Sequence, residues 1–195
     1  GRLADLQRQG VDIINFGLGE PDFPTPANIA QAGKEAIDAN HTKYTAVAGI
    51  APLREAICEK LKRDNHVLYT PDQISVGTGA KQPLFNSVQA LVDEGDEVLL
   101  PTPCWVSYVE MIKLAGGIPV QVPSLEADGF ALNIPALEQA ITPRTKAIII
   151  NTPNNPTGAV YSEQSLRSLG ELACKHDFYI ISDEVYEKLT YNGKQ

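Results

Sequence analysis

The stretch KAIIINTPNNPTG, residues 146–158, decides the fold of this chain, because a short apolar strand runs directly into a rigid loop. Apolar residues at helical spacing predict a helix on each side of it, at residues 134–140 and 162–175. Another strand is predicted at residues 179–182. Strands that alternate with helices need crossover connections, which join parallel neighbours. The predicted fold class is therefore α/β, with a mostly parallel sheet flanked by helices.

Further elements are predicted towards the N-terminus, and the alternation of strands and helices continues back to about residue 71. Apolar runs predict strands at residues 11–18, 74–76, 97–100 and 118–122. Helical spacing of apolar residues predicts helices at residues 26–39, 52–65, 81–92 and 106–115. Thr25 is expected to cap the first of these helices, with Pro26 in its first turn.

Length, composition and charge indicate a globular, acidic chain. Its 195 residues are 43% hydrophobic and 21% charged, which is enough apolar material for a buried core. Acidic residues outnumber basic ones by 24 to 16, and the net charge of −8 argues against a nucleic-acid partner. No apolar run approaches the roughly 20 residues that cross a bilayer, and residues 1–5 lack the features of a signal peptide. We therefore expect no membrane partner.

The cysteines and histidines indicate neither a disulfide framework nor a metal site. Three cysteines are scattered without CxxC spacing, at positions Cys58, Cys104 and Cys174. Three histidines likewise lack metal-ligand spacing, at positions His41, His66 and His176. Because free thiols are typical of a reducing compartment, we expect a cytoplasmic location and no metal.

Four motifs follow predicted strands, at the edge where parallel sheets bind their ligands. The first is GTGAK, residues 77–81, whose glycines and unpaired helix-start amides suit a phosphate group, with Lys81 adding a positive charge. It lacks the spacing of a P-loop and the third glycine of a dinucleotide fingerprint. On this motif alone, a plain strand-to-helix turn is an equally good interpretation.

The second and third motifs, residues 101–105 and 151–158, offer a flat ring and neutral donors. Trp105, the single tryptophan, follows a strand and is suited to covering a flat cofactor, although most tryptophans lie in the core. Asn154 and Asn155 belong to a proline-fixed loop that is longer than a simple turn requires. This length favours a binding loop over turn composition alone.

The fourth motif, SDEVY at residues 182–186, places Asp183 directly after a buried strand. A carboxylate there is costly unless a cation or several donors meet it, which indicates a partner such as a protonated heterocyclic nitrogen. Tyr186 is placed to offer a phenol to the same ligand. The alternative is that Asp183 caps a helix, which leaves Tyr186 without a role.

These motifs, together with NFGLGEPDFPTP at residues 15–26 and KYTAVAGIAPLRE at residues 43–55, resemble the class I pyridoxal-phosphate aminotransferases. Within that family the resemblance is to the bacterial aspartate and aspartate/prephenate aminotransferases in particular. It implies the large domain of a fold type I enzyme, with pyridoxal 5'-phosphate as cofactor. The implied reaction moves an amino group between an amino acid, aspartate or glutamate, and a 2-oxo acid.

The resemblance also implies contacts to the cofactor phosphate and to the face of its ring. The backbone amides of Gly79, Ala80 and Lys81 would hold the phosphate, and Trp105 would stack on the pyridine ring. Tyr44 matches the tyrosine that reaches the phosphate bound by the neighbouring subunit in this family. The resemblance therefore implies a homodimer with shared sites.

Contacts to the polar atoms of the ring and to the substrate are implied in the same way. Asn155 would donate to the phenolic oxygen of the ring, assisted by Tyr186, and Asp183 would pair with the ring nitrogen. The substrate would meet the backbone of Gly19 through its carboxylate, and would also contact Trp105 and Asn155.

One large departure from the family concerns its Schiff-base lysine, which we expect beyond Gln195, so that no catalytic residue is assigned within the chain. We therefore interpret these residues as the amino-terminal half of a longer enzyme, inactive alone. Residues 1–28 would belong to the small domain, and residues 29–195 to the first part of the large cofactor-binding domain. The alternative, that Lys81, Lys188 or Lys194 replaces the Schiff-base lysine, is disfavoured because none of the three matches the family's position.

Three other functions are compatible with parts of the sequence. A carbon–sulfur lyase of the same fold would share the ring-binding residues, and a non-catalytic binding or assembly module would explain the missing lysine. A dinucleotide-binding module that uses residues 77–81 is disfavoured, because the next strand ends in Leu99, Leu100 and Pro101 and offers a ribose no acidic residue.

Overall fold

The computed structural model describes residues 2–14 and 23–191. Within this part of the chain, no helix has the length and apolar character needed to cross a membrane. The chain divides into two units, residues 1–45 and 46–195. This division does not test the predicted domain boundary at residue 28, which stays a prediction.

The described part of the first unit contains two helices, α1 (Arg2–Arg8) and α2 (Ala27–Asp38). The helix predicted at residues 26–39 is therefore confirmed as α2, but its predicted cap by Thr25 is wrong. Pro26 occupies the cap position with an extended backbone, and no side chain caps the helix.

Two other differences from prediction concern this unit. No helix is predicted from the sequence at residues 2–8, where the structure forms α1. The strand predicted at residues 11–18 is absent from residues 11–14, and residues 15–18 lie outside the described residues.

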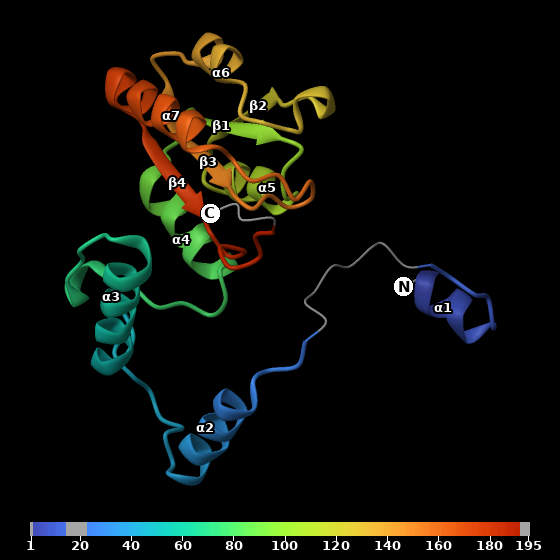
Figure 1. Ribbon diagram of the computed structural model, residues 1–195, viewed down its shortest axis with the longest axis vertical. Coiled ribbons are helices and arrows are strands. Elements are labelled where there is room, and N and C mark those ends of the chain that lie inside the picture. The colour runs from blue at the N-terminus through green and yellow to red at the C-terminus, as the bar shows by residue number, and fades with distance from the viewer. Residues whose placement is uncertain (1, 15–22, 192–195) are drawn as a thin grey trace. The chain divides into compact units, whose positions relative to one another are not determined.

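A four-stranded parallel sheet forms the centre of the second unit (Figure 1). Its strands are β1 (Glu97–Thr102), β2 (Ile118–Pro123), β3 (Thr145–Asn151) and β4 (Tyr179–Asp183). Their order in the sheet is β2-β1-β3-β4, and each neighbouring pair is parallel. The α/β class predicted from residues 146–158 is thereby confirmed.

The helices of this unit lie close to their predicted positions. They are α3 (Ala51–Asn65), α4 (Lys81–Leu91), α5 (Ser107–Leu114), α6 (Ile134–Ala140) and α7 (Glu163–His176). Two short 3-10 helices accompany them, η1 (Pro71–Gln73) and η2 (Glu126–Asp128). α7 begins after Ser162, whose hydroxyl accepts a hydrogen bond from the Ser165 amide, so a side-chain cap fixes where this helix starts.

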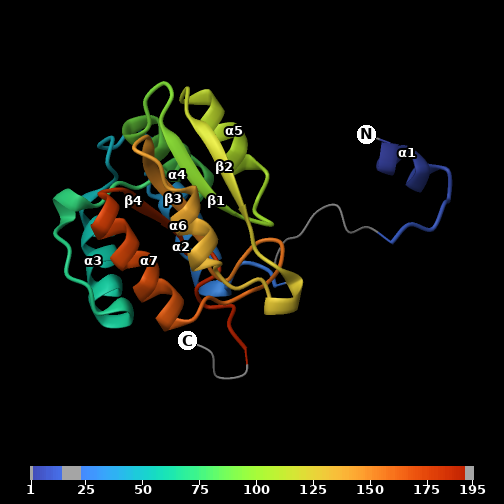
Figure 2. The same ribbon diagram turned by 90° about the horizontal axis from the view of Figure 1, so that it is seen from above.

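The central strands are apolar on both sides because helices cover both faces of the sheet (Figure 2). Successive side chains of β3 alternate between the faces, so Ile148 and Ile149 belong to different hydrophobic clusters. Ile148 packs with α6 and α7 through residues such as Leu137 and Leu169. Ile149 belongs to the cluster of α4 and α5, which includes Ile112. The sheet is thus held rigidly between two helical layers.

The strand predicted at residues 74–76 is not formed. Val76 donates one backbone hydrogen bond to Ala48, at 3.0 Å. A strand needs a continuous ladder with a neighbour, and no strand in the described part of the chain pairs with these residues. Ile74 has an extended backbone, so the apolar pattern indicates the local conformation at this residue but not a position in the sheet.

Replacing Glu97 by Gln should lower the free energy of unfolding at neutral pH. It should also make this free energy decrease less as the pH falls. Glu97 is 5% exposed and accepts hydrogen bonds from Thr142 and Arg144, which hold its pKa below the ordinary value of 4.5. Its charged form is therefore stabilising above about pH 4.5, and this contribution disappears as the pH falls through the lowered pKa. We expect a loss of about 1–3 kcal/mol at pH 7. Urea unfolding from pH 3 to pH 7 measures this, and equal pH dependence in both proteins would contradict it.

Candidate functional site

Three strands deliver their C-terminal residues to one edge of the sheet. β1 ends at Thr102, β3 at Asn151 and β4 at Asp183. Because β3 and β4 are in parallel register, Asn151 and Asp183 are direct neighbours across the two strands. The polar motifs that follow these strands therefore lie together, as is typical of ligand sites in open α/β sheets.

The GTGAK motif forms the start of α4 and leaves three amides available. Gly79 has a left-handed backbone, with φ +64°, and a Cβ at this position would meet no atom within 4 Å. At Gly77 an added Cβ would lie 2.7 Å from Pro83. The amides of Gly79, Ala80 and Lys81 donate no hydrogen bond within the described part of the chain. Unpaired donors at a helix start favour an anion.

Trp105 follows β1 and is partly exposed beside the start of α4. Its ring contacts that of Tyr108 edge to face, with centroids 5.4 Å apart and planes at 88°. The Lys81 ammonium lies 4.9 Å from the centroid of the indole ring. Trp105 is therefore partly buried against the hydrophobic cluster of α4 and α5.

Asp183 is a buried carboxylate that meets only neutral donors. It is 7% exposed, and its Oδ2 accepts a hydrogen bond from the Tyr108 hydroxyl at 2.7 Å. Its Oδ1 accepts from the Val185 amide at 3.1 Å. No cation in the described part of the chain forms an ion pair with it. The alternative of a helix cap is wrong, because residues 185–188 form a turn and no helix follows Asp183 in the described part of the chain.

Tyr108 stays protonated because of its surroundings. Burial raises the pKa of its hydroxyl, and the hydrogen bond to Asp183 raises it further. The Tyr108 hydroxyl therefore keeps its proton at neutral pH and donates it in the hydrogen bond to the Asp183 carboxylate.

The loop after β3 is held by its own asparagines. The carbonyl oxygen of the Asn154 side chain accepts hydrogen bonds from the Thr157 amide and hydroxyl, so Asn154 serves the turn. The Asn151 side chain is 3% exposed and contacts both Asn155 and Asp183. The Asn155 side chain is partly exposed and makes no hydrogen bond within the described residues. Of the two asparagine side chains predicted to bind a ligand, that of Asn154 is used within the loop and that of Asn155 is available.

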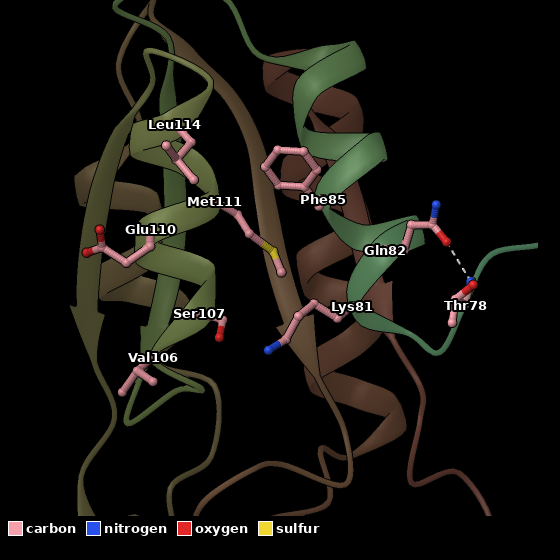
Figure 3. Close-up of a pocket in the computed structure, with 9 residues that line it drawn as sticks. All are labelled: Thr78, Lys81, Gln82, Phe85, Val106, Ser107, Glu110, Met111 and Leu114. Atoms are coloured by element: carbon pink, nitrogen blue, oxygen red, sulfur yellow. Dashed lines mark hydrogen bonds between the residues drawn. The ribbon is translucent and has the colours of Figure 1, made fainter. Parts of the chain in front are cut away.

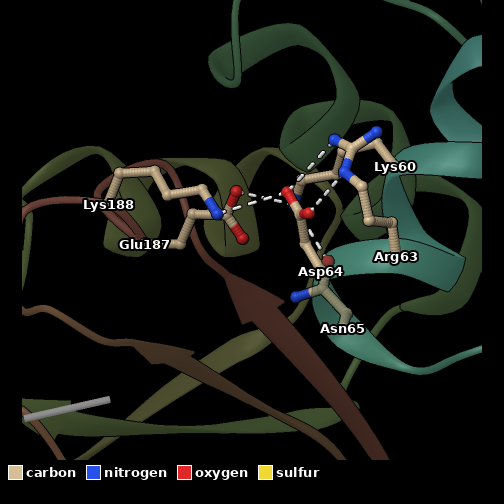
Figure 4. A network of polar contacts seen from close by, with 6 residues as sticks. All are labelled: Lys60, Arg63, Asp64, Asn65, Glu187 and Lys188. Carbon is tan, nitrogen blue, oxygen red and sulfur yellow. Dashed lines mark hydrogen bonds and ion pairs between the residues drawn. The ribbon is translucent and has the colours of Figure 1, made fainter.

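The segment after Asp183 is fixed to α3 by ion pairs (Figure 4). Lys60 pairs with Glu187 at 2.6 Å, and Lys188 pairs with Asp64 at 3.2 Å. The hydrogen bond from Lys60 holds the pKa of Glu187 below its usual range. Tyr186, which is partly buried in this segment, lies near enough to Tyr108 to influence its pKa.

A groove of about 630 Å³ opens between α4 and α5, next to the GTGAK motif (Figure 3). Lys81 points into it from the start of α4, opposite Ser107. Phe85 and Met111 give its inner part an apolar lining. Among the described residues, no group of three or more histidine, cysteine, aspartate or glutamate side chains is arranged to hold a metal ion.

Four of the predicted site residues are connected, either directly or through one intervening residue. They are Lys81, Trp105, Asn155 and Asp183. Tyr186 lies in the turn that follows Asp183. Gly79 and Ala80 lie at the helix start beside Lys81. Tyr44 is exposed and belongs to the first unit, and Gly19 lies outside the described residues, so both roles stay predictions.

A family model for class I and II aminotransferases matches residues 11–195. The chain belongs to this family. An aspartate aminotransferase of Bacillus subtilis is 51% identical over 194 residues, which is 100% of this chain and 49% of that protein. An aspartate/prephenate aminotransferase of Thermus thermophilus is 50% identical over 193 residues, covering 99% of this chain and 50% of the relative.

Solved structures of the aminotransferase family agree with this assignment. The aspartate aminotransferase of Thermus thermophilus with maleate has a TM-score of 0.95 and 49% identity, covering 99% of this chain and 50% of that one. The present chain therefore spans about half the length of the aminotransferases it matches. The fold type I architecture expected from the resemblance is confirmed over this half.

Sequence reasoning missed two polar residues that connect this candidate site. Tyr108 lies three residues after Trp105 on the buried face of α5, and Asn151 follows the apolar run at residues 147–150 of β3. Each places a polar atom where the pattern otherwise favours an apolar one, which is the signal that points to them.

Proposed function

We propose that this chain is the cofactor-binding part of an enzyme that transfers amino groups between aspartate or glutamate and a 2-oxo acid, using pyridoxal phosphate. The observation that supports this most is the buried Asp183 carboxylate, which has two neutral donors and no cationic partner in the described part of the chain. Burying a carboxylate without a counter-charge is costly. A protonated pyridine nitrogen would supply that charge.

The other strand-end residues fit the remaining groups of pyridoxal phosphate. The amides of Gly79, Ala80 and Lys81 would receive the phosphate, since they are unpaired at a helix start. Trp105 would cover one face of the ring. Asn155 would donate its free side-chain amide to the phenolic oxygen.

Bound pyridoxal phosphate supplies an electron sink for the electron pair left when the substrate loses its α-proton. Asp183 would hold a proton on the ring nitrogen and so strengthen that sink. Tyr108 and the Val185 amide would keep the carboxylate aimed at the ring. Tyr186 would assist Asn155 at the phenolic oxygen.

The proposals for the substrate and for the oligomeric state are supported by the relatives and by residues outside the described site. Maleate, present with the Thermus thermophilus enzyme, is a four-carbon dicarboxylate, which supports aspartate as a substrate class. Gly19, Trp105 and Asn155 are proposed to contact the substrate. Tyr44 is proposed to reach a partner subunit in a homodimer, and the cytoplasmic location stays a prediction. The cofactor-bearing lysine is proposed to lie outside these 195 residues.

An assay of the full-length protein with added pyridoxal phosphate tests this function. Aspartate and 2-oxoglutarate should yield oxaloacetate and glutamate, with little activity when the cofactor is omitted. Release of pyruvate and ammonia from a sulfur amino acid, without amino transfer, would instead establish the lyase. Lack of pyridoxal-phosphate binding would overturn both and favour a non-catalytic module.

Replacing Trp105 by Leu in the full-length protein should weaken pyridoxal-phosphate binding about two- to tenfold, because the planar stacking partner is lost. Leucine retains apolar contact with the core, so the melting temperature of the cofactor-free protein should change little. Equilibrium dialysis and thermal unfolding measure the two effects, with the exposed neighbour Val106→Ala as the control. Normal cofactor binding together with a large loss of cofactor-free stability would identify Trp105 as a core residue.

A further inference from the structure

Asn151 connects the two loops that hold the candidate ring contacts. Its side-chain amide donates to the backbone carbonyl of Asp183 at 2.9 Å. Its side-chain oxygen accepts from the backbone amide of Asn155 at 2.7 Å. Asn151 and Asp183 are also paired in register at the ends of β3 and β4. One buried side chain therefore joins the loop of Asn155 to the loop of Asp183.

Both contacts are made to backbone atoms, so they fix the positions of the two loops independently of the side-chain conformations of Asn155 and Asp183. Asn151 is 3% exposed, and water has little access to replace either hydrogen bond. Asparagine offers a donor and an acceptor on one short side chain, and both are used here. A carboxylate at this position would lose the bond that needs a donor, and an apolar residue would lose both bonds.

We propose that Asn151 is a positioning residue that sets the spacing between Asn155 and Asp183. The inference rests on the proposed function, in which Asn155 contacts the phenolic oxygen and Asp183 contacts the nitrogen of the same pyridine ring. A rigid ring has a fixed distance between its phenolic oxygen and its nitrogen, so both contacts form together only when the loops keep one spacing. The phosphate cradle at Gly79 has no hydrogen bond to Asn151 and does not depend on this spacing.

The test compares two probes on the full-length protein: pyridoxal phosphate, which needs both the cradle and the ring contacts, and inorganic phosphate, which needs the cradle alone. The variant is Asn151→Leu, which keeps the approximate volume and removes both hydrogen bonds. The control is Thr152→Val, at the next residue of the same loop. It removes the hydroxyl that accepts a hydrogen bond from the Tyr161 amide, and this hydrogen bond does not involve Asp183. Thermal unfolding confirms that each protein is folded at the assay temperature.

We expect Asn151→Leu to raise the dissociation constant of pyridoxal phosphate about 10- to 100-fold, by analogy with other residues that orient ligand-contacting groups. The dissociation constant of inorganic phosphate should stay within about twofold, and Thr152→Val should leave both nearly unchanged. If Asn151→Leu does not fold, Asn151→Ser, whose hydroxyl can still form a hydrogen bond, should show a smaller loss of affinity, for pyridoxal phosphate alone.

Two results would overturn the role of Asn151 while leaving the proposed function intact. In one, the Asn151 variants bind pyridoxal phosphate as the parent does. In the other, the variants lose affinity for pyridoxal phosphate and for inorganic phosphate equally, which indicates a general structural role. Failure of the parent protein to bind pyridoxal phosphate would instead overturn the proposed function.

Discussion

Replacing Asp183 by Asn in the full-length protein should slow amino transfer by between about tenfold and a thousandfold while pyridoxal phosphate remains bound. An adjacent carboxylate favours the protonated form of a basic nitrogen by about one to three pKa units, and asparagine removes this charge. Asparagine keeps the shape of the side chain and an oxygen that accepts from Tyr108. The loss should therefore fall on the rate rather than on the affinity, as steady-state kinetics and equilibrium dialysis would show.

Glu184→Gln provides the matched control for this experiment. Glu184 is the next residue, is exposed, and accepts a hydrogen bond from the Ser182 hydroxyl on the surface. Removing its charge should leave the rate nearly unchanged. If Asp183→Asn and Glu184→Gln both transfer amino groups at the parental rate, the electronic role assigned to Asp183 is wrong.

Replacing Leu169 by Ala should destabilise the protein by about 2–5 kcal/mol, because truncation of a fully buried leucine leaves a cavity. Leu169 is 1% exposed on α7 and packs in the same cluster as Ile148 of β3. Leu125→Ala is the control, since Leu125 is 54% exposed and its truncation should cost less than about 0.5 kcal/mol. Urea unfolding compares the two, and equal losses would contradict this description of the core.

The strands and the strand-end motifs were accessible to sequence reasoning because both depend on local pattern. Ile148, Ile149 and Ile150 form an uninterrupted apolar run, which a two-sided parallel sheet requires. The residues after such strands fall at the ligand edge by topology alone. Trp105, Asn155 and Asp183 were therefore recognisable as candidate site residues from their positions in the sequence.

The contacts between these residues were not accessible, because they depend on side chains distant in sequence. The hydrogen bond from Tyr108 to Asp183 spans 75 residues, and that from Asn151 to Asp183 spans 32. The failed strand at residues 74–76 has the same cause, since pairing depends on a neighbour that local pattern does not specify. The failed cap at Thr25 instead reflects uncertainty of one or two residues at helix ends.

The most direct test of the proposed cofactor site is a nitrogen-15 NMR measurement on pyridoxal phosphate labelled in its ring and bound to the full-length protein. Asp183 should keep the ring nitrogen protonated at neutral and mildly alkaline pH, and Asp183→Asn should give the resonance of an unprotonated nitrogen under the same conditions. An unprotonated ring nitrogen in the parent protein, or the same resonance in both proteins, would contradict the assignment of Asp183 as its partner.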